Sequence, residues 1–207
     1  MSYSPGWTDQ ELNMINVVDV FQLKPVIMKK AEGFLNELKY ALVNEITQLN
    51  LTLPPLTDFT KGQIARGENY KGFPFISLDM PQRFSKTEIF TYRTVFWWGH
   101  CLIFSFIFKG GFVPLYCQNL TTRRTQYQDQ KIYLATSHNP FEWELNEKNY
   151  KVISELSDHD IQKTINETKF IKLACFYPLT DRTFKTLDWK TAGLNTFRAI
   201  AQIVLIN

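Results

Sequence analysis

The sequence predicts an α+β fold with a mostly antiparallel sheet, because helical and strand patterns are interleaved along the chain. A long helical pattern occupies about residues 25–49, a second occupies about 189–205, and short strand patterns lie between them. Strands that follow one another closely in sequence pair most readily as antiparallel neighbours. We therefore expect both helices to pack on one sheet.

The first long helix is expected to begin near Pro25, since proline fits the first turn of a helix. Apolar residues then recur between Ile27 and Leu49 with the spacing of one buried helical face. The opposite face carries lysine and glutamate. This pattern predicts a helix that lies along a sheet or along another helix.

The strongest strand patterns form a hairpin at residues 88–98 and 101–108, where aromatic and β-branched side chains alternate. Gly99 and His100 supply the turn, or a bulge within one long strand. We expect this hairpin to form the centre of the sheet. Further strands are expected at 73–79, 132–135 and 169–177, and a further helix at about 157–167.

Other segments are expected to connect these elements. Residues 1–7 are interpreted as a loose tail, followed by Thr8 or Asp9 as the cap of a short helix. Residues 50–72 show little periodicity and are expected to form a long connection. Residues 121–130 are interpreted as a polar loop or hairpin tip, although their basic and aromatic residues also resemble a minimal surface for single-stranded nucleic acid.

Length and composition indicate one globular domain spanning residues 1–207. Aromatic residues form 15% of the chain, which favours an aromatic-rich core over stacking surfaces. The net charge of +3 is far from the basic footprint of a dedicated nucleic-acid binder, so a nucleic-acid partner is not favoured. The sequence does not specify an oligomeric state, and a homo-oligomer is left open.

No secretory signal is recognised at the N-terminus, and the longest apolar run, 95–108, is too short to span a bilayer. We therefore expect a soluble, cytoplasmic protein with no membrane partner. The cysteines, Cys101, Cys117 and Cys175, are odd in number and lack the CxxC spacing of a zinc ribbon. The histidines lie far apart, so the sequence predicts no metal site and specifies no cofactor.

The most unusual polar residue is Arg93, which lies in the middle of the strand pattern TYRTVFWW. A charge at such a position is costly unless it is paired. Glu68 and Asp79 are the carboxylates suggested as partners. The pair is expected either to close a core or to form the cationic floor of a pocket.

We interpret the chain first as a module that binds a small molecule or an anion in an aromatic-lined pocket. Arg66 and Arg93 would anchor the ligand, and Tyr70, Trp97 and Trp98 would form the walls. The glycine-hinged loop around Arg66, next to a strand, is a common way to build such a site.

Two alternatives remain open at this point. In an enzyme, Glu68 or Asp79 would act as general base, His100 as a second acid or base, and Arg93 as an electrostatic stabiliser. In a protein-interaction or structural domain, the aromatic residues would only form the core. The sequence does not decide whether the protein is an enzyme.

Overall fold

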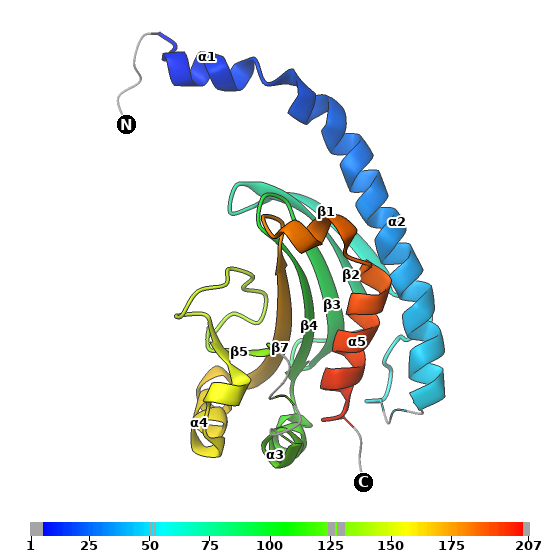
Figure 1. Cartoon of the computed structure of the whole chain (residues 1–207). Coiled ribbons are helices and arrows are strands. Elements are labelled where there is room, and N and C mark those ends of the chain that lie inside the picture. The colour runs from blue at the N-terminus through cyan, green and yellow to red at the C-terminus, as the bar shows by residue number, and fades with distance from the viewer. Residues whose placement is uncertain (1–5, 50, 52, 124–126, 128–130, 205–207) are drawn as a thin grey trace.

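The computed structural model describes residues 6–49, 51, 53–123, 127 and 131–204. Most of the tail expected at residues 1–7, the final residue of the helix expected at 189–205 and most of the tip expected at 121–130 lie outside the described residues. Residues 121–123 of that tip are not a loop, because they form the end of a helix, Val113–Arg123. Within the described part, five α-helices accompany a seven-stranded antiparallel sheet (Figure 1). The predicted α+β class is therefore confirmed.

The sheet has the strand order β1-β2-β3-β4-β7-β5-β6, and all its pairings are antiparallel. The central hairpin is confirmed, with Trp97 opposite Cys101 at its closed end. Gly99 has a φ of 75°, which the turn requires and which glycine adopts without strain. The strands are β1 (Gln63–Tyr70), β2 (Phe73–Phe84), β3 (Ile89–Trp97), β4 (Cys101–Lys109), β5 (Tyr133–Ala135), β6 (Tyr150–Val152) and β7 (Phe170–Pro178).

Strand β1 corrects the expectation that residues 50–72 form only a connection. It pairs with β2 through a tight turn at Lys71 and Gly72, whose φ values of 51° and 89° are both positive. Positive φ at both central residues is typical of the turns that fit two-residue hairpins. The strand was missed because β1 is an edge strand without buried residues, so it lacks an apolar alternation.

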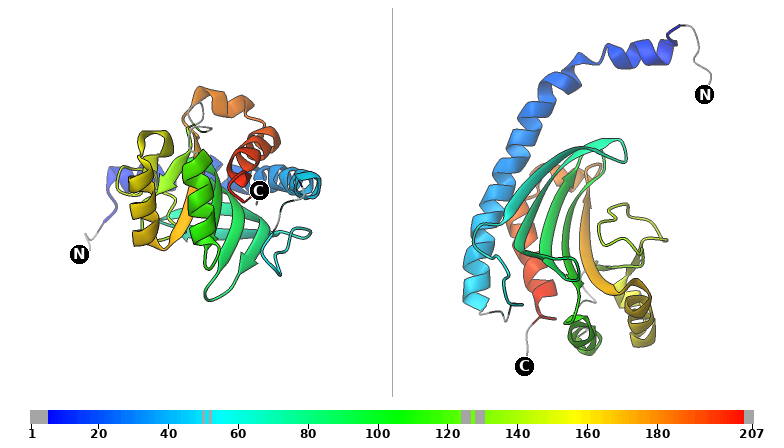
Figure 2. Two further views of the ribbon diagram at one scale, coloured as in Figure 1. Left: turned by 90° about the horizontal axis from the view of Figure 1, so that it is seen from below. Right: turned by 180° about the vertical axis from the view of Figure 1, so that it is seen from behind.

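Different parts of the chain lie on the two sides of the sheet. Helices α2 and α5 pack against each other and cover one face, as Figures 1 and 2 show. On the other side, a segment that we call the strap, residues 136–149, lies beside the sheet. The α-helices are α1 (Asp9–Ile15), α2 (Val18–Leu49), α3 (Val113–Arg123), α4 (Asp158–Thr168) and α5 (Trp189–Ala201), and short 3-10 helices occupy Ile153–Glu155 and Arg182–Thr186.

Helix α2 begins at Val18, earlier than the predicted start near Pro25. A proline inside a helix removes its own N–H donor and disturbs one turn, but the helix continues through it here. Residues Val18 to Lys24 were missed because they show no separation into an apolar and a polar face. The short helix α1 is confirmed, with Thr8 as its cap in a capping box with Glu11.

Helix α5 fits closely between the sheet and α2. A Cβ atom added at Gly193 would lie 2.8 Å from the side chain of Leu38 and 3.0 Å from that of Phe104. The buried hydroxyl of Tyr92 donates a 2.6 Å hydrogen bond to the Gly193 carbonyl. At the next turns, Arg198 binds the Glu45 carboxylate of α2 through two hydrogen bonds. The helix-covered face of the sheet is therefore tightly packed.

Candidate functional site

Arg93 lies on the face of the sheet that is turned away from α2 and α5, directly opposite Asp79 of β2. Its Nε and Nη2 atoms donate hydrogen bonds of 2.8 Å to the two carboxylate oxygens of Asp79. The Thr91 hydroxyl donates a third bond of 2.8 Å to the same carboxylate. Asp79, and not Glu68, is therefore the partner of Arg93.

The Arg93 guanidinium is also covered by aromatic rings. The ring centre of Phe141, in the strap, lies 4.7 Å from the guanidinium carbon, and that of Phe84 lies 5.7 Å from it. The side chains of Arg93 and Asp79 are only 16% and 4% exposed. A desolvated pair of this kind needs good hydrogen bonds to be tolerated, and Asp79 supplies them.

Glu142 fixes the middle of the strap to the sheet. Its carbonyl accepts hydrogen bonds from the Tyr150 hydroxyl and from Lys172 Nζ. Its carboxylate accepts hydrogen bonds from Lys71 and from the Trp143 N–H. Burial acts to raise the pKa of Glu142, but the hydrogen bond from Lys71 and those from backbone N–H groups outweigh it and lower the pKa. The carboxylate is thus kept charged as a structural anchor.

Lys172 of β7 is the most unusual ionisable group in the described part of the chain. It is 1% exposed, and its Nζ donates a 2.5 Å hydrogen bond to the Glu142 carbonyl. Burial, assisted by the positive charge of Arg93, lowers the pKa of Lys172 to about 7. The sequence analysis missed this residue, because a lysine in the pattern KFIKLACFY is easily assigned to a solvated face.

Next to this polar cluster lies a second, smaller core of aromatic side chains. The Tyr70 ring lies 3.9 Å from Trp143 and 5.3 Å from Trp97, measured between centroids. His100 stacks on Trp97 at 3.6 Å, and its Nδ1 is 2.8 Å from the Trp98 carbonyl oxygen. These rings pack on one another and on the strap, so this arrangement resembles a core more than the wall of a pocket.

The remaining site residues suggested by the sequence lie on the other side of the sheet. Arg66 is in register with Ile76 of the helix-facing core, and its Nη2 lies 2.6 Å from the Glu32 carboxylate of α2. Glu68 forms an exposed ion pair with Lys24 of α2.

Trp98 packs against the helix-facing core, whereas Trp97 belongs to the second core. The structure therefore brings Tyr70, Asp79, Arg93, Trp97 and His100 to one face and separates them from Arg66, Glu68 and Trp98. The two arginines do not form joint anchors of one site, and Glu68 does not share a face with His100.

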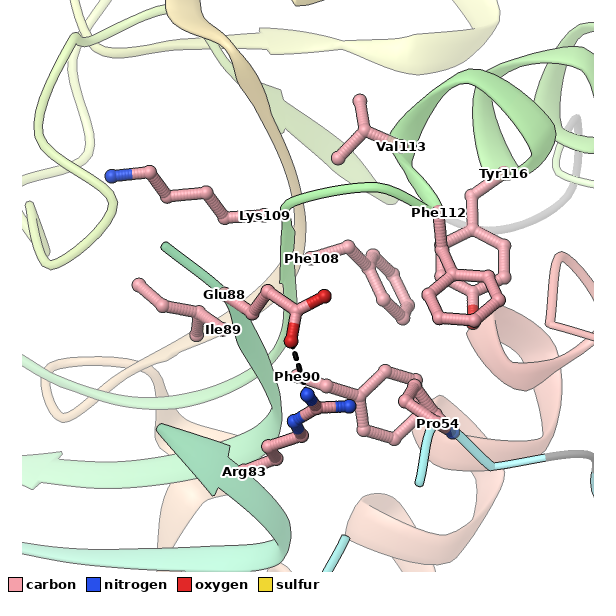
Figure 3. A pocket seen from close by; sticks show the side chains of 10 residues that line it. All are labelled: Pro54, Arg83, Glu88, Ile89, Phe90, Phe108, Lys109, Phe112, Val113 and Tyr116. Carbon is pink, nitrogen blue, oxygen red and sulfur yellow. Dashed lines mark hydrogen bonds and ion pairs between the residues drawn. The ribbon is translucent and has the colours of Figure 1, made fainter. Parts of the chain in front are cut away.

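None of three hollows on the described surface is lined by a residue that the sequence suggested for the site. One is a crevice between the β3–β4 hairpin and α3, with the Arg83–Glu88 ion pair at its edge (Figure 3). Its volume of about 10 Å³ is roughly that of one water molecule. Two open grooves, of about 490 Å³ between α3 and α4 and about 650 Å³ beside β6, lie elsewhere.

Catalytic signatures are weak in the described part of the chain. Its three cysteines are free, and burial raises the pKa of Cys101 to about 12 and also raises those of Cys117 and Cys175, which disfavours the reactive thiolate. Among the described residues, no group of three or more His, Cys, Asp or Glu side chains is placed to hold a metal ion. No described helix is both long and apolar enough to cross a membrane.

Comparison with known proteins found no matching family model, no matching curated protein and no matching solved structure.

The most unusual surface of the molecule is a segment that we call the arm, residues 7–27. It comprises α1 and the first turns of α2, and it extends past one end of the sheet and arches over that end (Figure 1). No residue of α1 is buried, and the first buried residue of α2 is Met28. The arm holds eleven of the eighteen exposed large hydrophobic residues, namely Trp7, Leu12, Met14, Ile15, Val17, Val18, Val20, Phe21, Leu23, Val26 and Ile27.

Proposed function

We propose that this protein is a protein-interaction module and that the arm is its binding element. The observation that carries the proposal is the concentration of exposed apolar side chains on these 21 residues, with Phe21 73% and Val26 62% exposed. Scattered apolar residues on a surface are ordinary, but a continuous apolar patch marks a site of interaction. Apolar helical surface is normally packed against another element, but no residue of the arm is buried by the described part of the chain.

The central polar cluster supports a ligand-binding or catalytic function less well. Arg93 is bound to Asp79 and covered by Phe141, and Lys172 is bound to the strap. A group that is to bind a ligand or transfer a proton needs an accessible cleft, and neither Arg93 nor Lys172 lines any of the three hollows described above. The groove beside β6 comes nearest, because its lining residue Tyr150 contacts Lys172. These contacts favour a structural role for the cluster.

The charge of the arm favours a protein partner over an anionic membrane surface. Its ionisable residues are Asp9, Glu11, Asp19 and Lys24, and Lys24 is paired with Glu68 of the body. Helices that lie on anionic lipid surfaces typically carry lysine and arginine on their polar face. An acidic arm would be repelled from such a surface.

The proposal is tested by photo-cross-linking in cells that produce the protein naturally. A benzophenone amino acid at position 21 of the full chain is expected to give discrete protein adducts. The same group at position 56, where Leu56 is 92% exposed on the body, is the matched control and is expected to give few. The adducts at position 21 should disappear when Leu23 and Val26 are replaced by glutamine. Equal labelling from both positions, or no adducts from position 21, would exclude the arm as a binding element.

A further inference from the structure

We infer that the partner of the arm is a second copy of this chain, and that the two arms pair antiparallel about a two-fold axis. This inference rests on the proposed function, since it names the partner of the same binding element. It is carried by three observations: the apolar area of the arm, the lack of a comparable apolar area on the body, and the distribution of charge at the two ends of the arm.

The exposed area of the arm is of the size that a stable pairing needs. Each of its eleven large apolar side chains presents roughly 50 Å² to solvent, about half of what full burial removes from water. Together they offer on the order of 500 to 600 Å² per copy, approaching the roughly 800 Å² per partner of a standard interface. Two paired arms would therefore bury an apolar area that approaches the size of a standard interface.

The body of the described chain offers no similar surface to receive the arm. Its seven exposed large hydrophobic residues are spread over different elements: Tyr40 on α2, Leu56 and Phe59 in the α2–β1 connection, Phe73 and Phe84 at the two ends of β2, Phe112 before α3, and Leu145 in the strap. Within a second copy, the complement of matching character is another arm. An identical surface on both partners is what a two-fold interface requires.

The charges at the ends of the arm select the antiparallel arrangement. Asp9 and Glu11 lie near the start of the arm, between Trp7 and Leu12, and the exposed Lys29 and Lys30 follow its end. The apolar residues from Leu12 to Ile27 are centred between positions 19 and 20, so an antiparallel partner places its Lys30 opposite Asp9. Parallel arms would instead bring like charges together at both ends, which is unfavourable.

Sedimentation equilibrium of the purified full chain at micromolar concentrations tests this inference. The expected result is a reversible dimer, with twice the chain mass of 24.3 kDa. Replacing Phe21, Leu23 and Val26 by glutamine is expected to weaken association at least about 100-fold, because six apolar side chains then leave the interface. A control variant with Tyr40 and Leu56 replaced by glutamine removes exposed apolar residues of the body and should remain dimeric. Circular dichroism and the urea midpoint, compared at concentrations where each chain is monomeric, establish that the variants are folded.

Charge reversal tests the direction of the pairing. Asp9→Lys and Lys30→Glu should each weaken association by roughly two- to ten-fold at low salt, and the double variant should restore it. Single reversals without effect would overturn the antiparallel arrangement. A monomeric wild-type chain would overturn self-pairing, and adducts of position 21 with a different protein would then leave the interaction function standing. A monomer that also gives no adducts would refute both proposals.

Discussion

Replacing Asp79 by alanine is expected to lower the free energy of unfolding by about 3 to 5 kcal/mol. The substitution leaves the largely buried Arg93 guanidinium without its two hydrogen-bonded oxygens, and the Thr91 hydroxyl also loses its acceptor. Desolvation of an unpaired charge is one of the few single changes with so large a cost. Urea unfolding followed by tryptophan fluorescence measures the effect.

The matched control is Glu68→Ala on β1, which removes an exposed ion pair with Lys24 of α2. Exposed pairs contribute little, so a loss of less than about 1 kcal/mol is expected. Adding Arg93→Met to the Asp79→Ala chain should recover part of the stability, because the uncompensated charge is then gone. A loss below about 1 kcal/mol for Asp79→Ala would show that water already reaches Arg93, and the pocket interpretation would return.

Lys172→Met is expected to stabilise the protein at neutral and acidic pH. The pKa of Lys172 is about 7 in the folded chain and near 10.5 when the lysine is unperturbed, so the unfolded chain binds more protons between these values. The free energy of unfolding of the wild-type chain therefore rises as the pH increases from about 7 to 10.5. Below pH 7 the lysine is charged in both states, and the full cost of burying its charge lowers the stability. The pKa shift of Lys172 corresponds to a destabilisation on the order of 3 to 5 kcal/mol, which Lys172→Met removes. The substitution also loses the hydrogen bond to the Glu142 carbonyl, so the net gain is smaller by about 1 kcal/mol.

The informative quantity is the difference in free energy of unfolding between Lys172→Met and wild type at pH 6, 7, 8 and 9. This difference should be largest at pH 6 and should decrease toward pH 9. Lys151→Met, a change of an exposed lysine on β6, is the control and should give a small, flat difference. Should Lys172→Met be destabilised equally at every pH, the lysine would be charged in the core and favourably bound there.

The parts of the fold that depend on buried apolar periodicity could be predicted from sequence. The β3–β4 hairpin and the body of α2 bury a repeating set of side chains, and both were expected close to where they lie. Strand β1 was missed because none of its residues is fully buried, so its pairing with β2 leaves no apolar alternation in the sequence. When a residue is held in a strand only by pairing with a neighbouring strand, the sequence around it gives little indication of that strand.

The candidate site was predictable only in part. An arginine in an apolar strand implies a carboxylate, and Asp79 was one of the two suggested partners. Sequence alone did not show that β1 presents Arg66 and Glu68 to α2, because one residue of register decides which face a side chain occupies. The signal for the arm was present in the run VVDVFQL, which has one charge and five apolar residues out of seven.

The arm is the surface through which we infer that two copies of this chain pair. Hydrogen–deuterium exchange of the full chain at low and high protein concentration tests this pairing most directly, because amides of an uncovered helical arm exchange through local opening. Amides of residues 9–27 should become protected as concentration rises, while those of β3 and β4 stay unchanged. Exchange in the arm that is fast at every concentration, and the same after Phe21, Leu23 and Val26 are replaced by glutamine, would contradict pairing of the arm in the purified protein.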